Sequence, residues 1–196
     1  MDSVEYYDKN AVEYFEQTVD INMQTLWDLF TAQLAEGASI LDLGCGSGRD
    51  SAYFISCGFD VTAMDASEEM CDLASIHIGQ DVLKLSFAEM DFNEVFDGIW
   101  ACASLLHVPG DQIDEIFAKV VKSLKENGIL FMSFYYGDYE GERNGRYYKD
   151  YRTKSIKELI SGYENLEIIE LDKCDDLNPE ASAQWIYALL RKNETA

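Results

Sequence analysis

The stretch Ile40-Leu-Asp-Leu-Gly-Cys-Gly-Ser-Gly-Arg49 decides the fold that we predict for this chain of 196 residues. An apolar run of strand length leads into three alternating glycines, Gly44, Gly46 and Gly48, and a helical pattern follows them. Glycine permits a tight turn and close backbone approach by a ligand. Because ligands of open α/β sheets bind at the carboxyl ends of strands, this segment predicts a binding loop.

The same alternation of short apolar runs with helical patterns continues after this loop. The predicted strands are 39–43, 60–64, 82–85, 96–102 and 128–134, and the predicted helices between them are 49–56, 67–76 and 111–124. Strands that alternate with helices require crossover connections in a mostly parallel sheet covered on both faces. The sequence therefore predicts a three-layer α/β architecture.

The two ends of the chain differ from this core. Residues 11–34 carry apolar side chains at helical spacing and predict one or two amphipathic helices. Residues 135–151 are polar, aromatic and glycine-bearing, and predict a loop or an irregular hairpin. A helix over 153–161 and two strands, 166–171 and 184–190, complete the prediction; strands joined by a compact loop pair antiparallel most readily.

Composition excludes several classes of protein. The chain has 15 Lys and Arg against 37 Asp and Glu, a formal charge of -22 that disfavours binding to nucleic acid or to an anionic membrane surface. A length near 200 with 47% hydrophobic residues predicts one domain. With neither a basic, apolar leader nor a stretch of spanning length, we expect a soluble, cytoplasmic protein. The five cysteines are an odd, widely spaced set, so we expect reduced thiols and no metal site.

An acid follows the glycine loop at the distance that a nucleoside site needs. Asp65 closes the predicted strand 60–64, 21 positions after Gly44, and a carboxylate there can accept both hydroxyl hydrogens of a ribose. A dinucleotide fingerprint would require a third glycine at position 49, which is Arg49 here. The spacing therefore weakens a dinucleotide-binding interpretation.

The motif Leu-Asp-Leu-Gly-Cys-Gly, with Asp42 in the strand, resembles the first motif of class I methyltransferases that use S-adenosylmethionine. The resemblance continues through 59–67, 86–88, 96–108 and 124–130, the last similar to the family's L-K-P-G-G turn but with Glu126 and Asn127 in place of Pro and Gly. The chain looks closest to small bacterial enzymes of the tellurite-resistance methyltransferase group. This resemblance implies a Rossmann-like sheet of seven strands in the order 3-2-1-4-5-7-6, with an antiparallel last strand.

The resemblance also implies a division of the chain and a set of cofactor contacts. Residues 1–36 would be a helical lid, 37–134 the cofactor-binding core, and 135–196 the acceptor side. The implied contacts to S-adenosylmethionine are the glycine loop, the ribose-binding acid, the adenine site, the methionine site and a covering tyrosine: Gly44, Gly46, Asp65, Ala66, Phe87, Ala88, Ala101, Cys102 and Tyr14, with Tyr7 as a second covering tyrosine.

Four features keep two interpretations each. Asp42 either bonds amides of the glycine loop or touches ligand, and Arg49 either neutralises Asp42 or reaches the ligand carboxylate. His107 is a weak candidate for a catalytic base; the favoured alternative is a helix-entry residue bonded to backbone. The segment 143–151 is either a substrate gate or a solvated loop whose tyrosines pack on the last strands.

We expect an enzyme that transfers the methyl group of S-adenosylmethionine in line to a small molecule, leaving S-adenosylhomocysteine. A base is needed only where the acceptor must lose a proton. Two competing hypotheses are a catalytically silent S-adenosylmethionine-binding domain and a tRNA or protein methyltransferase that needs a partner. The acceptor and the oligomeric state do not follow from the sequence.

Overall fold

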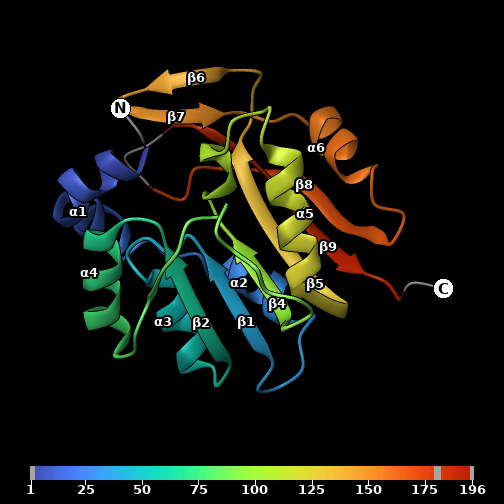
Figure 1. Ribbon diagram of the computed structural model, residues 1–196, viewed down its shortest axis with the longest axis horizontal. Helices are drawn as coiled ribbons and strands as arrows, with labels where there is room; N and C mark the ends of the chain where they lie inside the picture. The colour runs from blue at the N-terminus through green and yellow to red at the C-terminus, as the bar shows by residue number, and fades with distance from the viewer. Residues whose placement is uncertain (1–2, 179–181, 195–196) are drawn as a thin grey trace.

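A seven-stranded sheet in the order β3-β2-β1-β4-β5-β9-β8 runs through the middle of the molecule (Figure 1). The computed structural model describes residues 3–178 and 182–194. The strands of this sheet are β1 (Ser39–Leu43), β2 (Asp60–Asp65), β3 (Leu83–Lys84), β4 (Phe96–Ala101), β5 (Leu124–Tyr135), β8 (Leu166–Asp175) and β9 (Gln184–Lys192). Numbered among themselves, they have the order 3-2-1-4-5-7-6, so the predicted topology is confirmed. A separate hairpin, β6 (Glu140–Arg143) and β7 (Arg146–Lys149), lies outside the sheet.

Strand direction also agrees with the prediction. β1 pairs in parallel with β2 and β4, and β4 pairs in parallel with β5. β9 is inserted between β5 and β8 and runs antiparallel to both. The carboxyl ends of β1, β2 and β4 consequently meet at one edge, where the glycine loop and Asp65 lie.

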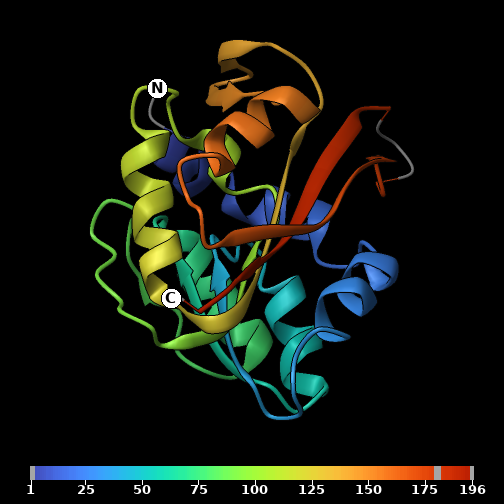
Figure 2. The same ribbon diagram turned by 90° about the vertical axis from the view of Figure 1, so that its right-hand side faces the viewer.

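Helices cover both faces of the sheet. In Figure 2, α5 (Ile113–Ser123) and α6 (Thr153–Ile160) lie on one side, and α2 (Gln24–Thr31) and α3 (Arg49–Ser56) on the other. Alternate strand residues pack into the two cores: Leu41 and Ile99 on the α5 side, Ile40 and Trp100 on the α2 side. Burial on both faces explains why these strands are continuously apolar. In the described part of the chain, no helix has the length and apolarity that crossing a bilayer requires.

Several element boundaries differ from the prediction; among the last strands, β8 ends at Asp175 rather than 171 and β9 ends at Lys192 rather than 190. The helix predicted over 111–124 begins at Ile113 and ends at Ser123, and β5 begins at Leu124 rather than 128. Leu124 pairs with Phe96 but Ile129 pairs with Gly98, so four residues bulge out of the β4–β5 ladder. Asn127 supplies a left-handed conformation there, with φ of 62°. Long-range strand pairing, which periodicity does not report, moved this boundary.

The N-terminal helix lies at the same end of the sheet as the β6–β7 hairpin (Figure 1). α1 (Ser3–Thr18) contains a kink at Asn10 and packs beside α4 (Glu68–Ile78). The Tyr147 amide donates a hydrogen bond to the Ser3 hydroxyl at 3.0 Å, which ties the start of the helix to β7. Segments from the two ends of the chain thereby close over the carboxyl edge of the sheet.

A buried carboxylate fastens the α2 side of the sheet. Asp50, 6% exposed, accepts hydrogen bonds from the indole N–H groups of Trp27 and Trp100, both at 2.8 Å. Arg49 donates to both carboxylate oxygens through Nε and Nη2. Burial raises the pKa of Asp50, but the charge and the donors of Arg49 and the two indoles outweigh it and lower that pKa. One ionised group therefore joins α2, α3 and β4.

Removal of this carboxylate should be strongly destabilising. In Asp50→Ala, the Arg49 guanidinium and two indole N–H groups would be buried without an acceptor, so we expect a loss of about 3–5 kcal/mol in the free energy of unfolding. Denaturant titration followed by circular dichroism measures this loss. The matched control is Asp28→Ala, an exposed acid on α2. A loss for Asp50→Ala no larger than that of the control would contradict the assignment.

Candidate functional site

The glycine loop holds a conformation that only glycine adopts without strain. Gly44, Gly46 and Gly48 have φ of 78°, 54° and 76°. A Cβ on Gly44 would lie 2.7 Å from the Cβ of Ser104, and one on Gly46 would lie 3.4 Å from the Tyr14 ring. Asp65 secures the loop, because its Oδ2 accepts from the Gly46 amide at 3.0 Å. The loop and the acid at the end of β2 thus form one unit.

A cavity of about 140 Å³ opens beside this unit. Most of the predicted cofactor-binding residues line it: Tyr14, Gly44, Gly46, Asp65, Ala66, Phe87 and Cys102. Ala88 and Ala101 do not; Ala88 is exposed and its carbonyl accepts a hydrogen bond from Lys119, and Ala101 is fully buried in β4. The structure therefore brings seven of these residues together at one cavity.

A larger cavity of about 260 Å³ lies on the other side of Tyr14. Its wall comes from α1, the end of β5, the β6–β7 hairpin and the β8–β9 ribbon. The aromatic residues of this wall are Tyr6, Tyr7, Tyr14, Tyr135, Tyr148 and Trp185. Its charged residues are Glu13, Arg49, Arg146, Asp175 and Asp176. We call this space the aromatic cavity and its smaller neighbour the glycine-loop cavity.

The two cavities share one wall. The residues that line both are Tyr7, Tyr14, Thr18, Arg49, Cys102, Ala103 and His107. Ala103 has a positive φ of 54°, which is unusual for a residue with a side chain, and its amide donates to the Ser133 hydroxyl at 2.9 Å. Backbone strain held in this way is frequent at binding sites. A ligand in one cavity can therefore contact a ligand in the other at this wall.

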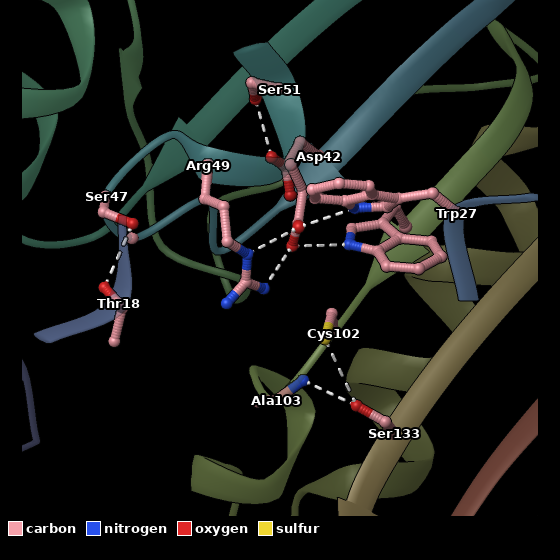
Figure 3. Close-up of polar contacts among 12 residues, drawn as sticks. Thr18, Trp27, Asp42, Ser47, Arg49, Ser51, Cys102, Ala103 and Ser133 are labelled. Carbon is pink, nitrogen blue, oxygen red and sulfur yellow. Dashed lines mark hydrogen bonds and ion pairs between the residues drawn. The ribbon is translucent and has the colours of Figure 1, made fainter. Parts of the chain in front are cut away.

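The acids of the first strand and helix take roles that sequence left open. Asp42 is 2% exposed, lines neither cavity and accepts a hydrogen bond from the Ser51 hydroxyl at 2.6 Å. Arg49 pairs with Asp50 rather than with Asp42. Figure 3 shows the Arg49 guanidinium between the Thr18–Ser47 pair and the side chain of Trp27. Arg49 is thus a cation held at the wall between the cavities.

His107 is buried and bonded on both sides. Its Nδ1 lies 2.7 Å from the carbonyl oxygen of Tyr147, and its Nε2 lies 2.8 Å from the hydroxyl of Tyr7. A carbonyl only accepts, so Nδ1 carries the proton and Nε2 accepts from Tyr7. Burial lowers the pKa of His107 to about 4. The favoured interpretation made this histidine a helix-entry residue bonded to backbone; the structure bonds it to the backbone of β7 and gives it a tyrosine partner as well.

Segment 143–151 is a folded hairpin rather than a solvated loop. Tyr148 and Tyr151 are 5% and 2% exposed. Their rings pack against Tyr135 and Phe134 of β5. Arg146 and Tyr148 line the aromatic cavity, so the hairpin supplies part of its wall.

Several cavity residues escaped the sequence analysis. Ser104 has a buried Oγ without a partner in the described part of the chain and faces the glycine-loop cavity. Trp185 and Asp176 meet in the aromatic cavity, joined by an indole hydrogen bond of 2.8 Å. The spacing of residues along the sequence does not predict these contacts, because they depend on the packing of the hairpin and of the β8–β9 ribbon.

Comparisons with known proteins agree with this geometry. Residues 40–128 match the family of methyltransferase domains. This segment, just under half of the chain, is similar to methyltransferase domains. It contains the glycine loop, Asp65 and the strained residue Ala103.

The curated relatives match only part of the chain. A putative methyltransferase, YqeM, from Bacillus subtilis (strain 168) is 36% identical over 109 residues, 50% of this chain and 43% of that protein. A ubiquinone biosynthesis O-methyltransferase from Rickettsia typhi (strain ATCC VR-144 / Wilmington) is 30% identical over 99 residues, 48% of this chain and 39% of that protein. The chain therefore spans less than half the length of these curated relatives.

A solved structure resembles nearly the whole chain. The 1,6-didemethyltoxoflavin-N1-methyltransferase of Burkholderia thailandensis, with bound 1,6-didemethyltoxoflavin and S-adenosylhomocysteine, superimposes with a TM-score of 0.80. It is 22% identical, and the match covers 97% of this chain and 87% of that one. At this identity the likeness establishes the fold: a Rossmann-like methyltransferase fold with the predicted sheet.

The buried acid beneath the glycine loop should make stability depend on pH. Burial first, and then the charge of Asp50, raises the pKa of Asp42 to about 8. The folded state then holds a proton that the unfolded state loses near pH 4, so this contribution is present below that pH and is lost as pH rises toward 8. Relative to Asp42→Asn, the wild type should lose up to about 1.4 kcal/mol per pH unit in this window.

Denaturant titrations at pH 5, 6, 7 and 8 measure this trend. Asp60→Asn, at the exposed start of β2, is the matched control and should keep the wild-type slope. A constant difference between wild type and Asp42→Asn across these pH values would show that Asp42 is ionised in the folded protein.

Proposed function

We propose that this chain is an S-adenosylmethionine-dependent methyltransferase that acts on a small molecule. The observation that carries the proposal is the pair of cavities that share the wall at Tyr14, Arg49 and Cys102. Methyl transfer is an in-line displacement, so it needs donor and acceptor in adjoining spaces with their reacting atoms aligned. The glycine-loop cavity supplies the donor space, and the aromatic cavity supplies the acceptor space.

The residues of the glycine-loop cavity suit S-adenosylmethionine, which would supply an activated methyl group on a sulfonium. The two carboxylate oxygens of Asp65 accept one hydrogen bond each, Oδ2 from the Gly46 amide and Oδ1 from the Ser67 amide. Each oxygen keeps a lone pair that can accept from a ribose hydroxyl. The unpartnered hydroxyl of Ser104 offers a further polar contact. Phe87 would lie against adenine, and Arg49 would reach the carboxylate of the methionine portion through the N–H groups that Asp50 does not use.

The size of the aromatic cavity supports a small acceptor. Its volume of about 260 Å³ falls just below the ~300–1,000 Å³ of pockets that hold drug-sized ligands. The net charge of -22 and the exposed acids Glu13 and Asp175 at its rim disfavour RNA. A tRNA or protein substrate would need a partner subunit that supplies a basic surface. We also propose that the chain is a member of the tellurite-resistance methyltransferase group and that it acts in the cytoplasm.

His107 positions Tyr7 in this proposal and is not the general base. A side chain whose pKa is about 4 holds a proton weakly at neutral pH. Its fixed tautomer instead directs the Tyr7 hydroxyl proton to Nε2, leaving the Tyr7 oxygen free to accept from Arg146 at 3.2 Å. The arrangement orients a phenol at the shared wall.

Loss of the Asp65 carboxylate should weaken cofactor binding. Hydrogen bonds to a charged group contribute about 1.5–3 kcal/mol, so Asp65→Ala should raise the Kd for S-adenosylhomocysteine about tenfold or more. Isothermal titration calorimetry measures the Kd directly. Asp60→Ala, at the opposite end of β2, should bind as the wild type does. Equal affinity of Asp65→Ala and the wild type would reject the ribose-binding role.

Turnover separates an enzyme from a silent binding domain. We expect wild-type protein, given S-adenosylmethionine and a small-molecule extract of cells, to form S-adenosylhomocysteine faster than Asp65→Ala does. Liquid chromatography with mass detection quantifies the product. Tight binding of S-adenosylmethionine with no turnover in any extract would favour the catalytically silent binding domain.

A further inference from the structure

Arg146 is a cation without a carboxylate partner at the wall of the aromatic cavity. In the described part of the chain, its only hydrogen bond runs from Nη1 to the Tyr7 hydroxyl at 3.2 Å, and its buried Nε has no acceptor. No described carboxylate lies within ion-pair distance of it. A buried donor without an acceptor costs about 1–3 kcal/mol, so this site favours a ligand that brings negative charge.

Two other arginines near this cavity, Arg143 and Arg49, each have a carboxylate partner. Arg143, on the other strand of the hairpin, donates to both carboxylate oxygens of Asp150 at 2.8 and 2.9 Å. Arg49, on the shared wall, is paired in the same way with Asp50. Of these three arginines, only Arg146 lines a cavity and has no ion-pair partner among the described residues.

Aromatic rings surround this guanidinium. Its carbon lies 4.5 Å from the ring centre of Tyr6, 5.5 Å from that of Tyr7 and 5.3 Å from that of Tyr148. Ring faces hold a cation in place without neutralising it. In the wall of the same cavity, the ring centres of Tyr135 and Trp185 lie 4.1 Å apart, and the two ring planes are inclined by 34°. These walls suit a flat ligand that stacks on rings.

We propose that the acceptor is an aromatic or enolic hydroxyl that Arg146 binds as its oxyanion beside Tyr7. This inference rests on the proposed methyltransferase function and names the substrate class of its acceptor cavity. The acceptor O–H proton leaves to water. An electron pair of the oxyanion then forms the C–O bond, the methyl–sulfur bond breaks with its pair on sulfur, and the sulfonium becomes the neutral thioether of S-adenosylhomocysteine.

This assignment makes a general base unnecessary and fits the charges that face the cavity. Burial raises the pKa of Tyr7 and that of Tyr148 well above the ordinary value and the pKa of Tyr14 to about 12, so these three phenols are neutral at pH 7. Asp176 accepts the Trp185 indole hydrogen bond, and the acids Glu13 and Asp175 are exposed at the rim, where screening limits their reach to about 8 Å at physiological salt. A neutral phenol therefore enters past the acids and ionises beside Arg146.

The test uses 4-nitrophenol, which is yellow as the phenolate and nearly colourless as the phenol. Spectra recorded from pH 5 to 9 with excess full-length protein, with and without S-adenosylhomocysteine, give the pKa of the bound probe. We expect the wild type to lower this pKa by about one unit from that in buffer. Arg146→Gln should abolish the shift, whereas Arg191→Gln, on β9 beside Gln33, should keep it.

4-Nitroanisole, which cannot ionise, is the matched probe and should bind wild type and Arg146→Gln equally. An unshifted or raised pKa on the wild type, no binding of 4-nitrophenol, or an equal shift in Arg146→Gln would overturn the assignment, provided that circular dichroism shows the variant folded. Arg146→Lys should retain part of the shift and serves if Arg146→Gln unfolds. Calorimetry with S-adenosylhomocysteine alone tests the proposed function separately, because it does not involve the acceptor cavity.

Discussion

The buried carboxylate of Asp50 is the interaction on which the rest of the site depends. It accepts both indole N–H groups, of Trp27 and Trp100, and pairs with Arg49, so one ionised group fixes α2, the start of α3 and the middle of β4. A carboxylate at this depth is stable only when donors surround it, and here Asp50 accepts four hydrogen bonds. Its geometry holds the Arg49 guanidinium at the wall between the cavities, directly after the glycine loop.

The two cavities share one wall but extend from it along different parts of the chain, and this explains how they can serve different ligands. Beyond the residues of α1, the glycine-loop cavity rests on strand ends and on backbone conformations that the sheet fixes. The aromatic cavity is closed by α1, the β6–β7 hairpin and the β8–β9 ribbon, which are joined by side-chain contacts such as Ser3 with Tyr147 and Tyr7 with His107. A fixed donor site beside an acceptor site built from added segments is consistent with the family match, which covers residues 40–128.

Sequence was informative where function follows from local geometry. Gly44, Gly46 and Asp65 could be assigned to one site because glycine loops and strand-end acids lie at fixed distances along the chain. Arg146 and Trp185 could not, because their neighbours are up to 139 residues away, as with Arg146 and Tyr7. The predicted start of β5 was wrong for a related reason. Leu124 pairs with Phe96, so the strand begins before the turn that the local pattern assigned to the end of a helix.

A crystal structure of the protein with S-adenosylhomocysteine would show where the donor binds. We expect ribose hydroxyls on Asp65, adenine beside Phe87 and the sulfur atom at the wall shared by the cavities, facing Tyr7 and Arg146. Ligand found in the aromatic cavity with the glycine loop empty, or with its sulfur directed away from the shared wall, would contradict this expectation.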